Sequence, residues 1–387
     1  MSWIKNGLTI VLSTLIALEG GSFVASKLHL LAVNDDPPYS WNLKRGLDWR
    51  NEKELWGGWH KPNAHDEAKA SCFDVKYRSN NVGARDDIDY TAAMPSGNVA
   101  VLGDSMVEGL GVPLEATFAH GLKAAYGKQG LNFGSAGNFG PLQEYILYRD
   151  LVKKIPHDEV VLFFLPGNDF KDNDYRGAGT FNNRYRPYFT QAADGGYSIV
   201  YPPGSKPSDR FPSERPKGFY DKIRTFLIAY TYFGNVVRSV YLLKDAHAAP
   251  KGPSTGDGYY TGDPVAVAGA AHYVNLLFDQ VDPADKKTIV IIPDQGDIRQ
   301  IRGKGWAYKQ LDWYKGLQSI AASHNARFLD LALDPTGAEN MDYLNKGYTP
   351  WFLTCDGHWS AAGNQMALDR YVAAQAAPAI APARQKP

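Results

Sequence analysis

The chain has 387 residues, and its 41 Lys and Arg side chains balance its 41 Asp and Glu side chains, so the formal net charge is zero. This balance argues against a protein that binds nucleic acids or other polyanions. A hydrophobic fraction of 44% and an aromatic fraction of 13% are enough for a sizeable buried core. The length allows one large domain or two small ones.

The first segment, residues 1–33, is apolar enough to interact with a membrane. Between Lys5 and Lys27 only Glu19 carries a charge, and a spanning helix needs about 20 mostly apolar residues. Glu19 lies in the outer half of this stretch, where a charge costs less than at the bilayer centre. We therefore expect an anchor in the inner (cytoplasmic) membrane that places the rest of the chain in the periplasm or outside. A signal peptide cleaved after the weak site Val24-Ala25-Ser26 and a helix of a soluble protein are the alternatives.

Residues 34–96 are rich in Trp, Asn, Asp and Pro and are expected to form an irregular N-terminal arm. The two cysteines of the chain are Cys72, in this arm, and Cys355, near the C-terminus. Disulfides persist in exported proteins, so we expect a bond between the two, with two unrelated core cysteines as the alternative. No group of His and Cys residues has the spacing of a zinc site.

From residue 97 to residue 376 the pattern alternates between strands and helices. Apolar segments of strand length occupy residues 98–102, 131–133, 159–165, 288–292 and 326–330. Helices are expected over residues 114–126, 141–153, 266–278, 308–324 and 361–374. Five strands with intervening helices predict an α/β domain, a flavodoxin-like three-layer sandwich around a five-stranded parallel sheet.

An insertion of about a hundred residues, 170–265, interrupts this alternation. A hairpin is expected from segments 185–189 and 197–201 around Asp194-Gly195-Gly196, and apolar residues at helical spacing predict a helix over 219–245. A loop insertion of this size beside the strand ends is a candidate lid. The tail at 377–387, which is rich in Ala and Pro, is expected to be disordered.

Residues suited to acyl transfer follow the expected strands. Ser105, Gly137 and Asn168 each come just after one of the first three strands, and Asp356 and His358 precede the last helix. Ligands of open α/β sheets bind in the crevice beyond the carboxyl ends of the strands, so these residues are expected to converge. A serine there needs a base, a group that orients the base, and donors for the oxyanion.

At these residues the chain resembles the SGNH/GDSL hydrolases, over about residues 98–365. The matching blocks, in order, are Gly103-Asp104-Ser105, Asn132-x-Gly134-x-x-Gly137, Gly167-Asn168-Asp169 and Asp356-Gly357-His358. Many members have two residues between acid and base, whereas this chain has one. Its Asp-x-His-Trp form is similar to that of membrane-associated SGNH-like proteins of exopolysaccharide acylation.

The resemblance implies an SGNH fold, with Ser105 as nucleophile, His358 as base and Asp356 as its orienting partner. With the short spacing, a backbone carbonyl is the alternative partner of the histidine. The resemblance also implies that the Ser105 N–H, the Gly137 N–H and the Asn168 amide bind the oxyanion. Neither a metal nor an organic cofactor is implied. Candidate substrate contacts are Arg78, Arg85 and Asn138.

Three functions remain open. The leading one is an exported, membrane-anchored carboxylester hydrolase acting on an acyl ester, such as an O-acetyl group on a polysaccharide. The second is an O-acyltransferase that hands the acyl group to a sugar hydroxyl. The third is a non-catalytic SGNH-like protein that binds carbohydrate. The acyl chain, the alcohol part of the substrate and the oligomeric state are left open.

Overall fold

The computed structural model describes residues 2–28, 30, 37, 44–70, 72–177, 184–211, 219–237 and 258–376. Its centre is a five-stranded sheet in the order β12-β11-β8-β6-β7, with every neighbouring pair parallel. The strands are β6 (Val99–Gly103), β7 (Gly130–Gly134), β8 (Glu159–Phe164), β11 (Lys286–Ile291) and β12 (Arg327–Asp330). The expected α/β class and its five-stranded parallel sheet are confirmed.

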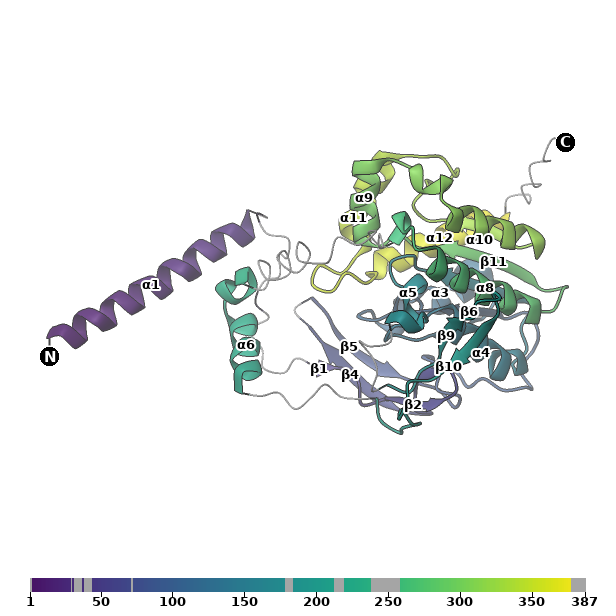
Figure 1. Cartoon of the computed structure of the whole chain (residues 1–387), viewed down its shortest axis with the longest axis horizontal. Helices are drawn as coiled ribbons and strands as arrows, with labels where there is room; N and C mark the ends of the chain where they lie inside the picture. Colours follow the sequence, from purple (N-terminus) through teal and green to yellow (C-terminus); the bar gives the residue numbers. More distant parts are fainter. Residues whose placement is uncertain are drawn as a thin grey trace.

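Helices flank this sheet (Figure 1). Every residue of β6, β7 and β8 is buried, which requires cover on both faces of the sheet. The covering helices include α3 (Phe118–Tyr126), α4 (Pro141–Asp150), α8 (Pro264–Gln280), α10 (Asp312–Ser323) and α12 (Ala361–Ala376). Helix α3 packs against α12, and α8 packs against both α4 and α10.

The order of the strands determines where a crevice can form. From β6 the chain moves to β7 on one side, and then crosses to β8 on the other side of β6. Connections that leave two adjacent strands in opposite directions open a crevice at their carboxyl ends. The topology thus favours a crevice beyond β6 and β8, the strands that lead to Ser105 and Asn168.

Residues 79–96 contain no helix or strand, as expected of an irregular arm, but the expectation is wrong for the described part of residues 44–78. This part contains five short strands: β1 (Lys44–Arg45), β2 (Arg50–Glu54), β3 (Gly57–His60), β4 (His65–Lys69) and β5 (Asp74–Arg78). They form a β1-β4-β5 sheet and a β2-β3 hairpin, all antiparallel. Trp49 is fully buried and stacks on His60 and Tyr77, with ring centroids 3.9 and 4.9 Å apart. Aromatic stacking therefore gives the arm an ordered core.

Within the insertion, the hairpin of β9 (Tyr188–Gln191) and β10 (Tyr197–Val200) is confirmed. The expected helix over 219–245 is instead divided. Helix α6 (Phe219–Tyr230) ends before Thr231, and the chain is helical again over 232–237. Residues 238–245, like the expected disordered tail at 377–387, lie outside the described residues. Two further helices of ten or more residues were not expected, α9 (Gln295–Lys304) and α11 (Met341–Trp351).

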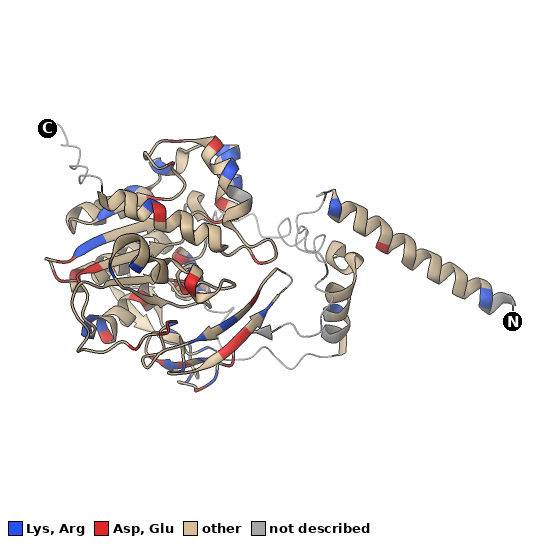
Figure 2. Cartoon of the chain, turned by 180° about the vertical axis from the view of Figure 1, so that it is seen from behind, with Lys and Arg blue, Asp and Glu red and all other residues tan. Residues whose placement is uncertain are grey.

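Helix α1 (Ser2–Lys27) extends away from the α/β domain (Figure 1). Its stretch Lys5–Lys27 is long and apolar enough to cross a membrane, and almost none of it is buried against the rest of the protein. A lysine lies near each end, and Glu19 is the acidic residue between them (Figure 2). The expected apolar N-terminal helix is confirmed, and together with the disulfide between Cys72 and Cys355 it suggests export.

Candidate active site

Ser105 and His358 meet at the carboxyl end of β6. Ser105 is the first residue of the short helix α2 (Ser105–Glu108) and is partly exposed. The carboxylate of Asp104 caps this helix by accepting the Met106 N–H at 2.9 Å. The Nε2 atom of His358 lies 2.8 Å from the Oγ atom of Ser105. A serine and an imidazole at this distance can exchange a proton.

Asp356 contacts the other ring nitrogen of His358, Nδ1, through its carboxylate. The structure thus pairs the histidine with the carboxylate rather than with a backbone carbonyl, despite the single intervening residue. Gly357 allows this because it has a φ of 86°, a left-handed conformation that residues with a Cβ atom rarely adopt. The chain reverses at Gly357, so that both flanking side chains point to the same side.

The segment that carries the base is held against the one that carries the serine. Phe352 and Trp359 form an antiparallel bridge, and Leu353 donates its N–H to the His358 carbonyl at 2.7 Å. The Trp359 N–H donates to the Met106 sulfur at 3.4 Å. Because Met106 follows Ser105, this contact fixes the segment of His358 relative to the serine.

The disulfide between Cys72 and Cys355 is confirmed, with Cα atoms 5.7 Å apart. The Cys355 N–H also donates to the Cys72 sulfur at 3.2 Å. Cys355 adjoins Asp356, so the bond attaches the N-terminal arm to the loop that holds the base.

Asn168 is hydrogen-bonded to the residue before Ser105, and both Asn168 and the loop of Gly137 offer N–H donors. The Asn168 Nδ2 atom donates to the Asp104 carboxylate at 3.0 Å, which fixes the orientation of the amide and leaves its second hydrogen for another acceptor. Gly137 has a φ of 102°. Within the described part of the chain, the N–H groups of Gly137 and Ser105 have no acceptor. Such donors are suited to an oxyanion.

Two arginines hold the loop that contains Gly137. The Arg50 Nη1 atom donates to the Ala136 carbonyl at 2.8 Å, and the Arg184 Nη1 atom donates to the Gly137 carbonyl at 2.9 Å. The carbonyl and N–H of one trans peptide point in opposite directions. Since the Ala136 carbonyl and the Gly137 N–H share a peptide, Arg50 determines where that N–H points.

Glu108, on the helix that begins with Ser105, completes this network. Its carboxylate accepts two hydrogen bonds from Arg50, at 2.5 and 2.7 Å, and another from the Ala136 N–H. His60 Nε2 lies 3.2 Å away. Burial alone would raise the pKa of Glu108, but the Arg50 and His60 charges and these hydrogen bonds lower it below its usual value. Glu108 therefore stays ionised and links the serine helix to the oxyanion loop.

Arg50→Lys is expected to reduce kcat by roughly 10- to 100-fold with little change in KM. Lysine keeps the positive charge beside Glu108 but lacks the planar fork that also reaches the Ala136 carbonyl. Ester turnover should be measured alongside the unfolding midpoint. An unchanged kcat would remove Arg50 from the site, and a loss matched by unfolding would make its role structural only.

The three candidate substrate contacts lie in different environments. Arg85 is 1% exposed and donates to the carbonyls of Glu108, Gly109 and Val112, so the prediction that it contacts substrate is wrong. Arg78 ends β5 and is exposed, without a contact to the serine or histidine. Asn138 is partly exposed next to Gly137, and its Nδ2 atom donates to Asp172 at 3.1 Å. Of the three, only Asn138 adjoins the candidate oxyanion loop.

Three further carboxyl groups, those of Glu144, Asp169 and Asp172, are buried in the α/β domain. Burial raises the pKa of Asp172 to about 6, and it raises those of Glu144 and Asp169 well above their usual values, with their mutual repulsion adding to the shift. Among the described residues, no group of three or more His, Cys, Asp or Glu side chains has a geometry that could hold a metal ion. Burial therefore favours the protonated form of Glu144 and Asp169.

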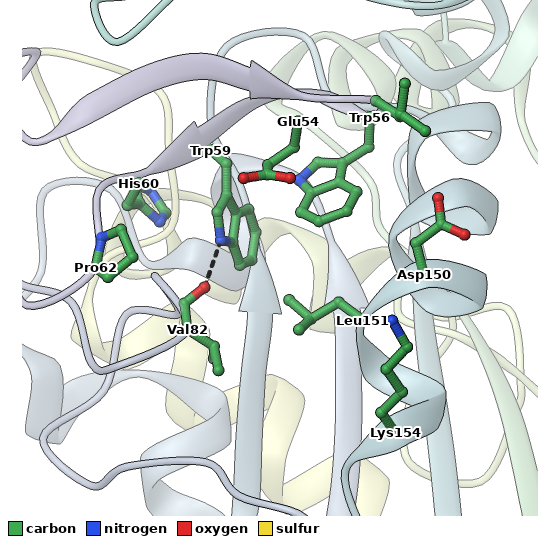
Figure 3. A pocket seen from close by; sticks show the side chains of 10 residues that line it. Glu54, Trp56, Trp59, His60, Pro62, Val82, Asp150, Leu151 and Lys154 are labelled. Carbon is green, nitrogen blue, oxygen red and sulfur yellow. Dashed lines mark hydrogen bonds between the residues drawn. The ribbon is translucent and has the colours of Figure 1, made fainter.

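A cavity of about 410 Å³ lies away from these residues, between the β2-β3 hairpin and the end of α4 (Figure 3). Trp56 and Trp59 line it with their rings nearly perpendicular, and the Trp59 Nε1 atom donates to the Val82 carbonyl at 2.9 Å. Neither Ser105 nor His358 lines this cavity. It is therefore separate from the candidate active site.

Comparison with models of known protein families and with curated proteins gives no match for this chain. The function must therefore be argued from the arrangement of its residues.

Proposed function

We propose that this chain is an exported serine hydrolase of the SGNH type that cleaves an acyl ester through an acyl-enzyme on Ser105. The observation that carries the proposal is the contact of His358 Nε2 with Ser105 Oγ at 2.8 Å, with Asp356 on the opposite ring nitrogen. A serine that contacts a histidine, which in turn contacts a carboxylate, is the catalytic triad of serine hydrolases. This triad occurs on several unrelated folds.

The topology of the sheet supports the family assignment. Counted in chain order, the strands lie 2-1-3-4-5, which is the flavodoxin-like order. The proposed nucleophile and the proposed oxyanion donor Asn168 follow the first and third of these strands, at the crevice. This is the position in which the resemblance to SGNH hydrolases expects them.

In the proposed reaction, His358 accepts the Ser105 hydroxyl proton while Oγ attacks the ester carbonyl carbon. The oxyanion is received by the N–H groups of Ser105 and Gly137 and by the Asn168 amide. The imidazolium, stabilised by Asp356, returns the proton to the leaving alcohol oxygen as the C–O bond breaks. Water then gives a proton to His358 and attacks the acyl carbon. Return of that proton to Ser105 releases the acid.

The pH profile of kcat/KM is expected to rise with pH as His358 loses its proton. Burial lowers the pKa of His358, but the hydrogen bond and charge of Asp356 and the charges of Asp104 and Glu108 outweigh burial and raise it. The midpoint of the acid limb should therefore lie above about 6.5. Asp356→Asn should move that midpoint to lower pH and also reduce kcat/KM. A midpoint that does not move would show that Asp356 does not act on His358.

An O-acyltransferase is the second candidate, because it would use the same acyl-enzyme with a sugar hydroxyl in place of water. The insertion supports it by reaching the proposed oxyanion loop. Arg184 binds the Gly137 carbonyl, and the ring of Phe211 lies against Gly137. A cover that excludes water favours transfer. We favour hydrolysis, since a cover also suits a large acylated substrate and water needs no dedicated pocket.

The test uses the full-length protein in detergent with a fluorophosphonate probe, which labels activated serines without a known substrate. Labelling is expected for the native chain and not for Ser105→Ala. No labelling of the native chain would favour a non-catalytic, carbohydrate-binding role.

A second assay tests whether water or a sugar hydroxyl accepts the acyl group. A chromogenic acetyl ester is supplied with and without oligosaccharides. Acetate release that is indifferent to the acceptor supports the hydrolase. Acetylated sugar formed faster than free acetate would establish the transferase in its place.

A further inference from the structure

Glu19, the acidic residue within α1, has a specific partner in the insertion. Its two carboxylate oxygens accept the backbone N–H groups of Tyr232 and Phe233 at 2.8 and 3.0 Å. These groups belong to the start of the helical segment 232–237, where N–H groups have no partner within the helix. A carboxylate also suits the positive end of a helix. The charge that is unusual in an apolar span is therefore satisfied by this contact.

Two aromatic contacts extend this docking toward the end of α1. The rings of Phe23 and Tyr232 meet edge to face with centroids 5.0 Å apart. The Lys27 ammonium lies 5.9 Å from the centroid of each of these rings. The outer end of α1 thus packs against the start of segment 232–237, and this segment contacts α6 through Asn235, whose Nδ2 atom donates to the Ile228 carbonyl at 3.3 Å.

Residues 219–237 expose large apolar side chains. The exposed fractions are 74% for Phe219, 85% for Tyr220, 42% for Ile223, 42% for Phe226 and 50% for Val237. Positions 219, 223 and 226 recur at the spacing of one helix face. Clustered aromatic and aliphatic side chains on a helix beside a membrane span are typical of a helix that lies in the bilayer interface. Arg224, exposed on α6, can reach lipid phosphates.

The position of Glu19 along α1 fixes the depth of this contact. Glu19 lies eight residues before Lys27, which is about 12 Å along a helix axis. The hydrocarbon core is about 30 Å thick. If the 23 residues Lys5–Lys27 span the hydrocarbon core, Glu19 lies within that core. The N–H groups of Tyr232 and Phe233, which donate to Glu19, then also lie below its outer surface.

We propose that residues 219–237 contact the lipid bilayer beside α1, with α6 lying in the interface of the leaflet that faces the catalytic domain. The proposal rests on α1 being retained as a membrane span, and it does not depend on the chemistry at Ser105. It assigns the insertion a second role, which is to hold the catalytic domain at a fixed place on the membrane surface.

The test places single nitroxide labels on the full-length protein in phosphatidylcholine liposomes. The native cysteines are bonded to each other, so Tyr220→Cys and Ile223→Cys each introduce one reactive thiol. Leu55→Cys, in the turn of the β2-β3 hairpin, is the aqueous control, and Ile16→Cys, on α1, is the lipid control; both side chains are exposed. Collision with oxygen, which concentrates in lipid, is compared with collision with a water-soluble nickel chelate.

Labels at 220 and 223 are expected to favour oxygen, as the label at 16 does, while the label at 55 favours the nickel chelate. Labels at 220 and 223 that behave like the one at 55 would overturn the proposal. Poor access to both reagents would overturn it in favour of a protein partner, and a label at 16 in water would remove its premise. Fluorophosphonate labelling of Ser105 is measured separately, so a failure here is distinct from a failure of the proposed hydrolase.

Cross-linking tests the docking contact itself. A Phe23→Cys and Tyr232→Cys pair is expected to form a disulfide on mild oxidation in liposomes. Glu19→Leu should reduce the cross-linked fraction, whereas Ser13→Leu, an apolar replacement elsewhere on α1, should not. Equal cross-linking in both variants would exclude Glu19 as the contact that holds the segment.

Discussion

Replacing Ser105 with alanine is expected to reduce kcat for an acyl ester by roughly 10⁴- to 10⁶-fold. Alanine keeps the backbone N–H that would bind the oxyanion but removes the hydroxyl 2.8 Å from His358 Nε2. His358→Ala should cost about as much, because without a base the hydroxyl keeps its proton. The double variant should add little to either single loss, since the two side chains act as a unit.

The measurement is steady-state hydrolysis of a chromogenic acetyl ester by the purified full-length protein. Ser198→Ala is the matched control, since Ser198 is an exposed serine on β10. It should keep full activity. A Ser105→Ala variant that retains more than a few per cent of turnover would end the Ser105 acyl-enzyme proposal. Losses that multiply in the double variant would mean that the serine and the histidine act separately.

Glu108→Gln is expected to reduce the free energy of unfolding by about 3–5 kcal/mol, because it leaves charged groups buried without their partner. Glu108 is fully buried, and Arg50, with 4% of its side chain exposed, binds it through two hydrogen bonds. The amide carries no charge to offset the guanidinium. The glutamine side chain also replaces one carboxylate oxygen with an NH₂ group, which cannot accept a hydrogen bond. In the native chain the carboxylate oxygens face Arg50, His60 and the Ala136 N–H.

Denaturant unfolding at pH 7 measures this loss, with Glu339→Gln as the control. Glu339 forms an exposed ion pair with Lys309 at 3.0 Å, and such pairs contribute about 0–1 kcal/mol. A loss below about 1 kcal/mol for Glu108→Gln would contradict the network described here. Because folding lowers the pKa of Glu108, its contribution is complete above the unfolded value of about 4.3 and decreases as the pH falls through the lower folded value.

The central sheet could be predicted because fully buried strands have a distinct composition. Strands such as β8 are almost entirely apolar, so their place in the chain is evident without their partners. The strands of the arm do not have this apolar composition. In β4, His65–Lys69, four of five residues are polar, and burial comes from Trp49 and Tyr77 elsewhere in the arm. Helix α9 was missed for a similar reason, since only Ile298 and Ile301 are apolar among its ten residues.

The candidate site was predictable where a residue follows a strand of the central sheet or, as Asp356 and His358 do, precedes the last helix within a motif of the family resemblance. Ser105, Gly137 and Asn168 follow such strands, and their convergence follows from the parallel sheet. Arg50 has no local signal, because the carbonyl that it binds is 86 residues away in the chain. Arg184 lies within the insertion, and its contact spans 47 residues. Arg85 was misassigned because a polar surrounding sequence does not reveal that its guanidinium is buried under α2.

The disulfide has a consequence for the order in which the site is completed. Cys72 and Cys355 are 283 residues apart, so the bond can form only after nearly the whole chain has been made and both thiols have reached an oxidising compartment. The proposed nucleophile and oxyanion donors all precede residue 170, whereas Asp356 and His358 come last. The bond is the covalent link between the arm and the segment of Asp356 and His358, which the Phe352–Trp359 bridge and the Trp359 contact to Met106 also hold. In the proposed hydrolase, synthesis and export would thus separate the serine in time from a fully held base.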